Sequence, residues 1–128
     1  MAKRVVIVDD SRTVLATAEL ALEELVGSGA LEVKAYLNPA ELLEALQGGS
    51  ETFDLLISDV NMPQLNGLEL ARALKSDARY STKPIIILTT ESSEEMKKIG
   101  KEIGVTGWMV KPFNNEKMVK TVRMVLGV

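Results

Sequence analysis

The stretch Leu55-Leu56-Ile57-Ser58-Asp59 shows the pattern that organises this chain, a short apolar run that ends in a polar side chain. Three further stretches repeat it: Val5–Val8 before Asp9-Asp10, Ile85–Leu88 before Thr89-Thr90, and Trp108–Val110 before Lys111-Pro112. Short apolar runs bounded by turn residues are typical of buried strands. If these runs are parallel strands of one sheet, the polar groups after them meet at one edge.

Helical patterns separate the apolar runs. After the first run, apolar residues recur three and four positions apart, at Val14, Ala18, Ala21, Leu22 and Leu25. We expect strands at about 4–8, 31–35, 55–58, 84–88 and 107–110, with a helix after each. This alternation predicts an α/β fold of the (βα)₅ type, a doubly wound, five-stranded parallel sheet covered on both faces.

Capping signals mark the helix starts. In Asn38-Pro39-Ala40-Glu41, Asn38 suits the cap, Pro39 the first helical position, and Glu41 a capping box. Ser92-Ser93 is expected to cap the fourth helix, and Asn114 or Asn115 the last one.

Composition excludes several kinds of site. The chain has 128 residues, no cysteine and no histidine, so disulfides, thiolate or imidazole metal sites and His-based triads are ruled out. The net charge of −3 and the mixing of acids with bases argue against nucleic-acid binding. We expect one domain over residues 1–128.

The sequence also argues against a membrane location. No apolar run approaches the roughly 18 residues of a membrane span, and the four apolar residues after Arg4 are too few for a signal peptide. The expected location is therefore the cytoplasm.

The predicted edge would hold a cation. Three neighbouring carboxylates, from Asp9, Asp10 and Asp59, repel one another unless a positive charge lies among them. An all-oxygen ligand set suits Mg²⁺. A carboxylate can also act as a nucleophile and become an aspartyl-phosphate, with Lys111 and the Thr89 hydroxyl near the phosphoryl oxygens.

Each residue alone has a simpler interpretation. Asp9 or Asp10 can cap the helix that begins near Ser11, and Asp59 or Thr89 can belong to a turn. Lys111 can be a solvated surface lysine. The functional interpretation depends on the residues occurring together.

As a set, these residues resemble the receiver domains of bacterial response regulators, particularly the stand-alone chemotaxis members. The motifs are an acidic pair after the first strand, Asp59-x-x-Met62-Pro63-x-x-x-Gly67, Thr89, and Lys111-Pro112-Phe113. The resemblance covers essentially the whole chain and implies a flavodoxin-like sheet with strand order 2-1-3-4-5.

The resemblance also implies roles for the acidic residues. Asp59 corresponds to the phosphoacceptor, Asp9 and Asp10 to the acidic pair that holds Mg²⁺, and the Asn61 backbone carbonyl to a further metal ligand. Gly67 corresponds to the glycine that lets the following loop turn into its helix. The side chains of Asn61 and Glu91 occupy positions that tune dephosphorylation in the family.

The remaining roles concern the switch. Thr89 corresponds to the hydroxyl that turns toward the phosphoryl group, and Lys111 to its cationic partner, with a cis Lys111-Pro112 peptide expected. Trp108 stands where the family usually has Tyr or Phe, and its N–H needs a partner when buried. Trp108 is either the switch aromatic or simply part of a partly exposed core strand.

The function implied is a phosphorylation-activated signalling switch of a two-component chemotaxis system. A histidine kinase would supply the phosphoryl group, and the chain would catalyse only its own phosphorylation and dephosphorylation. The surface of the fourth predicted helix, fifth strand and fifth predicted helix would change its affinity for a partner. Because the sequence ends at Val128 without an effector domain, we expect a monomer that binds a protein such as a flagellar motor switch protein, and possible control by a phosphatase.

Two alternatives remain. A phosphatase of the haloacid-dehalogenase type also uses an Asp nucleophile, but its Asp-x-Asp pattern follows the first strand, where this chain has Ser11. A phosphate sink, or a receiver excised from a larger regulator, would share the chemistry and differ in its output.

Overall fold

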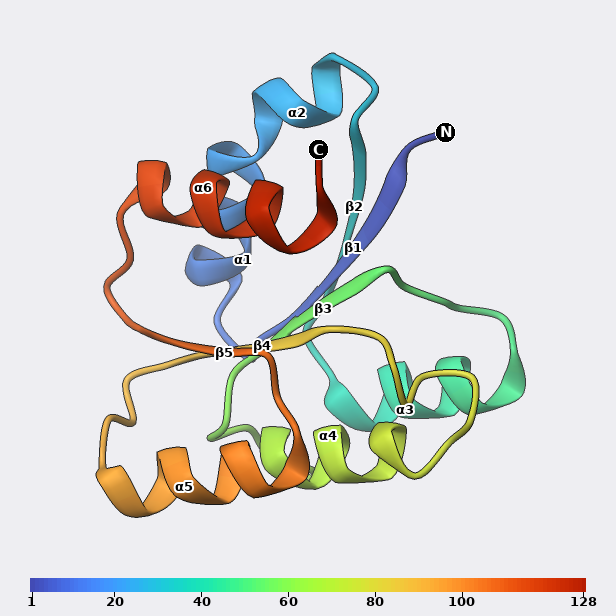
Figure 1. Ribbon diagram of the computed structural model, residues 1–128, viewed down its shortest axis with the longest axis vertical. Helices are drawn as coiled ribbons and strands as arrows, with labels where there is room; N and C mark the ends of the chain where they lie inside the picture. The colour runs from blue at the N-terminus through green and yellow to red at the C-terminus, as the bar shows by residue number, and fades with distance from the viewer.

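The protein is a five-stranded parallel sheet between two layers of helices (Figure 1). The computed structural model describes residues 1–128. The strands lie in the order β2-β1-β3-β4-β5, which confirms the predicted fold class and strand order. Their bounds are β1 Lys3–Val8, β2 Leu31–Tyr36, β3 Leu55–Ser58, β4 Ile85–Thr89 and β5 Gly107–Val110.

The helices form two layers with separate apolar cores. Helices α1 (Arg12–Ala21), α2 (Glu23–Gly27) and α6 (Asn115–Leu126) lie above the sheet in Figure 1, and α3 (Pro39–Gly48), α4 (Gly67–Lys75) and α5 (Glu94–Ile103) lie below it. Successive strand residues pack in different cores. Val5 and Ile7 lie in the core under α1, α2 and α6, and Val6 and Val8 lie in the core on the opposite face. Side chains alternate across a strand, so a strand covered on both faces is apolar on both, as β3 is up to the buried Ser58.

The register brings the carboxyl ends of the strands together. Val8 pairs with Ser58, Ser58 with Ile87, and Thr89 with Val110. The residues that follow β1, β3 and β5 therefore leave the sheet at the same edge.

The first helix departs from the prediction. The apolar pattern predicts one continuous helix, but the chain breaks at Leu22, where ψ is 3° and the N–H is shared by the Ala18 and Glu19 carbonyls. Leu22 and Leu25 are both buried in the core beside Leu31. The break leaves α2 packed on β2, and the residue pattern did not reveal it because both halves keep an apolar face.

One cap also differs from the prediction. Asn38 caps α3 through the Ala40 and Glu41 N–H groups, but the exposed Glu41 carboxylate does not return a hydrogen bond. The reciprocal capping box occurs instead at α4, where Leu68 N–H donates to Asn66 and Asn66 N–H donates to Glu69.

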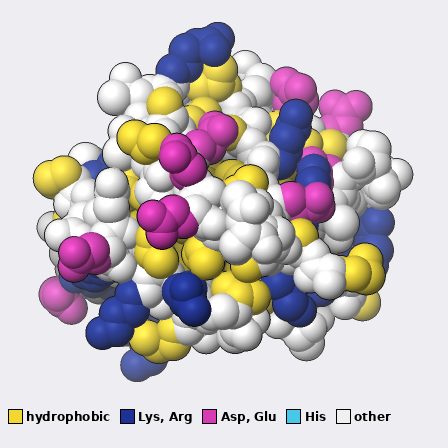
Figure 2. Space-filling model, turned by 90° about the horizontal axis from the view of Figure 1, so that it is seen from above, with side chains coloured by type: hydrophobic (Ala, Val, Ile, Leu, Met, Phe, Trp, Pro, Cys, Tyr) yellow, Lys and Arg dark blue, Asp and Glu magenta, His cyan; other side chains and the backbone are white.

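None of the helices is both long enough and apolar enough to cross a bilayer. Figure 2, which looks down on the side of α2 and α6, shows acidic and basic side chains close to one another with apolar side chains exposed between them.

Candidate functional site

Three carboxylates gather where β1 and β3 end. Asp9 and Asp59 follow these adjacent strands and are buried, with 1% and 7% of their surfaces exposed, whereas Asp10 is exposed. One carboxylate oxygen from each of the three lies within 4.8 Å of the others. The predicted cluster is therefore present at the predicted edge.

Lys111 bridges the two buried carboxylates. Its Nζ lies 2.6 Å from Asp9 Oδ2 and 3.0 Å from Asp59 Oδ2. Burial alone would lower the pKa of Lys111, but its hydrogen bonds to Asp9 and Asp59 outweigh burial and raise that pKa. For Asp9 burial prevails over the bond from Lys111 and raises the pKa of the carboxyl. Lys111 is thus an integral part of the site and not a solvated surface lysine.

The backbone fixes the orientation of Asp59. The Val60 N–H donates to Asp59 Oδ1 at 2.7 Å, and the Asp59 N–H donates to the Val8 carbonyl. The first residue of α4, Gly67, presses against this turn: a Cβ on Gly67 would lie 1.8 Å from the Asp59 carbonyl oxygen. Only glycine fits there, which agrees with the role expected for Gly67.

Asp9 contributes to the start of α1 as well as to the site. Its Oδ1 accepts the Ser11 N–H at 2.9 Å while its Oδ2 accepts Lys111. Ser11 itself caps α1 by accepting the Val14 N–H. The cap of α1 is therefore Ser11 and not Asp9, which accepts the N–H of the capping residue with one oxygen and the Lys111 ammonium with the other.

Thr89 and Trp108 are joined through the backbone of Glu91. The fully buried Thr89 accepts the Glu91 N–H at 3.2 Å, and the Glu91 carbonyl accepts the Trp108 Nε1–H at 2.9 Å. Thr89 lies at the same edge as Lys111 but makes no hydrogen bond to Lys111 or Asp59. The sequence singled out the Glu91 side chain and missed this link through its main chain, although the indole N–H signalled a need for an acceptor.

A glycine in α5 provides the space for the Trp108 ring. Gly100 is buried, and a Cβ on it would lie 2.9 Å from Trp108 Cζ3. Trp108 is half-buried and packs against the core on the α3–α5 side of the sheet. Apart from the glycine itself, no feature of the sequence indicated this contact.

The ligand chemistry fits a hard divalent cation. All of the available donors are oxygens, and the Asn61 carbonyl in the loop after Asp59 accepts no hydrogen bond from the protein. Lys111 already supplies one positive charge to Asp9 and Asp59. A cation in this cluster would share their oxygens with Lys111. The Lys111-Pro112 peptide is cis, as predicted.

Comparison with known proteins agrees with this geometry. Residues 5–123 match the model of the response regulator receiver domain. The chain is 33% identical to the chemotaxis protein CheY1 of Helicobacter pylori, over 97% of each protein. It is also 33% identical to the protein PilH of Pseudomonas aeruginosa, over 96% of this chain and 97% of that protein.

Solved structures give the same result for the fold. The chemotaxis protein CheY4 of Vibrio cholerae superposes with a TM-score of 0.86 at 38% identity, covering 98% of this chain and all of that one. The superposition covers almost the whole chain, so the similarity extends over the entire fold.

Proposed function

Because the chain belongs to the response regulator receiver domain family, we propose that it is a phosphorylation-controlled signalling switch whose phosphoacceptor is Asp59. One observation carries the proposal: the Asp59 carboxylate lies between the Val60 N–H and Lys111 Nζ, with oxygens of Asp9 and Asp10 within 4.8 Å. A nucleophile, a cationic partner and a metal-binding acidic pair thus meet at one point. We propose that residues 1–128 act as a single receiver domain.

The reaction is a transfer to an oxygen of Asp59. The Asp59 oxygen bonds to phosphorus as the bond from phosphorus to the imidazole nitrogen of a histidine kinase breaks, and the imidazole retains the electron pair. A Mg²⁺ ion held by Asp9, Asp10, Asp59 and the Asn61 carbonyl would neutralise charge on the phosphoryl oxygens. Lys111, which already contacts Asp59 at 3.0 Å, follows the new negative charge.

The signal then passes through Thr89 and Glu91. The Thr89 hydroxyl turns to donate to a phosphoryl oxygen, and the Glu91 N–H loses its present acceptor. The Glu91 carbonyl accepts a hydrogen bond from the indole N–H of Trp108, so a shift of Glu91 is transmitted to the Trp108 ring. A local change of charge in this way biases a two-state element.

We propose that the output surface is formed by α5, β5 and α6. Trp108 lies on β5 and packs against Gly100 of α5, so its movement changes this surface directly. The names of two relatives support a role in chemotaxis. From the family resemblance we propose a flagellar motor switch protein as the partner, a chemotaxis-type kinase as the donor and a cytoplasmic location. PilH is equally similar, so the pathway is the part of the proposal that needs its own test.

That test is a binding measurement. A purified motor switch protein is expected to bind more tightly when Mg²⁺ and beryllofluoride, a phosphoryl mimic, are present. Equal binding with and without the mimic would remove the motor from the proposal but leave the phosphoacceptor chemistry intact.

The central test measures mass. Incubation with Mg²⁺ and a small acyl phosphate is expected to add one phosphoryl group, and Asp59→Asn is expected to abolish the addition. Asp77→Asn, a surface aspartate outside the site, is the matched control and should be phosphorylated normally. No addition to the unaltered protein, or undiminished addition to Asp59→Asn, would contradict the proposal.

A further inference from the structure

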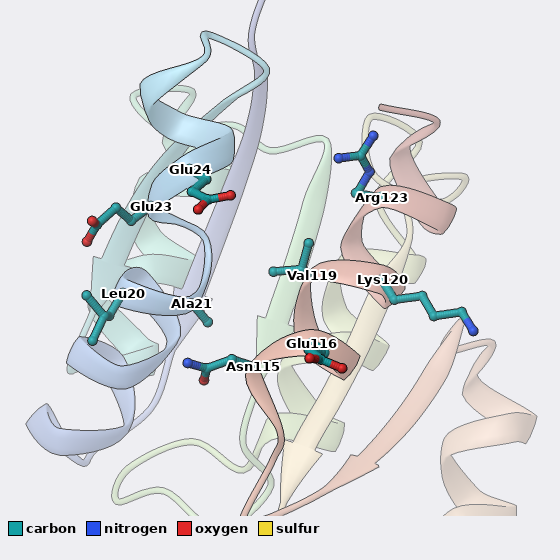
Figure 3. A pocket seen from close by; sticks show the side chains of 9 residues that line it. All are labelled: Leu20, Ala21, Glu23, Glu24, Asn115, Glu116, Val119, Lys120 and Arg123. Atoms are coloured by element: carbon teal, nitrogen blue, oxygen red, sulfur yellow. The ribbon is translucent and has the colours of Figure 1, made fainter.

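A groove separates α1 and α2 from α6 on the face opposite α3, α4 and α5. Its volume is about 620 Å³, and Figure 3 shows the side chains that line it. Leu20, Glu23 and Glu24 line it on the α1–α2 side, and Val119, Lys120 and Arg123 line it on the α6 side. The proposed phosphoryl chemistry uses none of these residues.

The two walls carry opposite charges that are not paired with each other. Glu23 and Glu24 are exposed on one wall, and Lys120 and Arg123 are exposed on the other. The ends of Glu23 and Lys120 point away from the opposite wall in Figure 3, so Glu24 and Arg123 are the charges nearest the groove. None of the six ion pairs of the protein involves any of these four side chains. Each wall therefore has free charge available for a partner.

Apolar side chains are exposed between the charges. Leu20, which lines the groove on α1, is 63% exposed. Val119, on α6, points into the groove toward α1 and α2 (Figure 3). Apolar residues flanked by charges of both signs are typical of a protein-binding surface.

The arrangement of charge selects one kind of partner, a second copy of this chain. A two-fold axis running along the groove would place α1 and α2 of one copy over α6 of the other. Residues at the same height along the groove would then face each other. Glu24 and Arg123 both lie toward the upper end of the groove in Figure 3, so acid would face base at two symmetric places. A two-fold axis across the groove would instead place acid against acid.

We infer that this face mediates weak self-association, with the acidic wall of α1–α2 in one copy contacting the basic wall of α6 in the other. The inference differs from the expectation of a monomer drawn from the sequence. It does not depend on Asp59 or on phosphorylation, because neither wall contains a residue of the site.

Charge reversal tests the pairing. Sedimentation at low salt should show dimers of the unaltered protein as its concentration rises from about 10 µM to about 1 mM. Glu23→Lys with Glu24→Lys, and separately Lys120→Glu with Arg123→Glu, should each weaken dimerisation about tenfold or more. Raising the salt should weaken the dimer of the unaltered protein as well.

Mixing the two double variants gives the decisive result. One variant has two basic walls and the other two acidic walls, so neither associates with itself, but an equimolar mixture should form a heterodimer. Lys3→Glu with Arg72→Glu alters two exposed cations elsewhere and should leave self-association unchanged.

Folding must be checked by thermal melting of each variant. If a charge variant unfolds, Leu20→Glu provides a milder disruption, because this side chain is already 63% exposed. A protein that stays monomeric at every concentration, or a mixture of the double variants that stays monomeric, would overturn the inference.

Discussion

Lys111 determines how the acidic edge is balanced when no other cation is bound. Its ammonium contacts two carboxylates that are almost completely buried, Asp9 and Asp59. Removing one partner from a buried ion pair leaves uncompensated charge, which is costlier than the pair itself is stabilising. Lys111 therefore stabilises the folded protein even when no phosphoryl group is present.

Lys111→Met should lower the free energy of unfolding by about 3 kcal/mol in metal-free buffer. Added Mg²⁺ should then raise the melting temperature of the variant more than that of the unaltered protein, because the carboxylates have lost their only ammonium. Thermal melts with and without Mg²⁺ measure both effects. An equal Mg²⁺ response in the two proteins would show that the cluster does not bind the ion as proposed.

Gly100 controls the position of Trp108. In Gly100→Ala, the added methyl group would meet Trp108 Cζ3 at 2.9 Å and Val105 Cγ2 at 3.2 Å, so the ring must move. We expect a loss of about 1–3 kcal/mol from overpacking and a changed Trp108 fluorescence spectrum. Trp108 is the only tryptophan, so the signal is unambiguous.

The matched control for this prediction is Gly48→Ala at the end of α3. A Cβ on Gly48 meets nothing within 4 Å, so this variant should be as stable as the original or slightly more stable. An unchanged fluorescence spectrum in Gly100→Ala would mean that the ring already has room to move.

At the scale of elements, the start of α4 and the end of β3 form one unit. The Gly67 N–H donates to the Val60 carbonyl at 2.9 Å. The Asp59 carbonyl oxygen occupies the space that a side chain on Gly67 would need. The helix therefore begins in direct contact with the turn that orients the nucleophile. A helix start that close leaves no space for a side chain.

Gly67→Ala should move α4 away from Asp59. A Cβ at 1.8 Å from a backbone oxygen forces a backbone shift, and we expect a loss of about 3 kcal/mol or more together with slower phosphorylation by an acyl phosphate. Gly27→Ala, at an open position at the end of α2, is the control. Normal phosphorylation kinetics in a folded Gly67→Ala protein would contradict the link between α4 and Asp59.

The elements differ in how far the sequence could predict them. The apolar runs predicted β1, β3, β4 and β5, and the alternation of apolar and polar residues at 31–35 predicted β2, each to within a residue. The break at Leu22 was not predictable from periodicity, since Ala18 before it, Leu22 itself and Leu25 after it are all buried. The capping signals of α3 and α4 look alike, and an exposed Glu41 can remain solvated at little cost.

The site shows the same division. The proximity of Asp9, Asp59 and Lys111 could be predicted because each residue directly follows a strand, and the strands end at the same edge of the sheet. The hydrogen-bonded path from Thr89 to Trp108 could not be predicted from the sequence. It runs through the backbone N–H and carbonyl of Glu91, and nearly every residue carries these groups. The space for Trp108 depends on α5 packing against β5, which no local pattern encodes.

At the scale of the whole molecule, a second polar cluster joins parts of the chain away from the candidate site. Buried Glu51, in the segment between α3 and β3, accepts Arg4 Nε at 2.6 Å and Nη2 at 3.0 Å and also accepts the Tyr36 hydroxyl. Arg4 further contacts Glu32 on β2. One carboxylate thus ties β1, β2 and the approach to β3 together.

This cluster should make stability depend on acid. Burial alone would raise the pKa of Glu51, but the hydrogen bonds from Arg4, Tyr36 and the Thr52 N–H outweigh it and lower the pKa from 4.5 to about 2. A carboxyl whose pKa is lowered on folding stabilises the protein above its unfolded pKa, and that stability is lost as the pH falls toward the folded pKa. The contribution, at most about 3 kcal/mol, should therefore be present at pH 7 and disappear between about pH 4.5 and about pH 2.

Glu51→Gln isolates this contribution. At pH 7 the variant should unfold at lower urea concentration, because Arg4 loses its buried counter-charge, and its difference from the unaltered protein should shrink toward zero as Glu51 becomes protonated. Glu32→Gln removes the other carboxylate that Arg4 contacts, but that side chain is 56% exposed, so we expect a change of less than about 1 kcal/mol. Urea titrations of the three proteins at several pH values between about 2 and about 7 measure these differences. A difference between Glu51→Gln and the unaltered protein that stays constant over that range would show that the cluster stabilises the fold by packing alone, independently of the charge on Glu51.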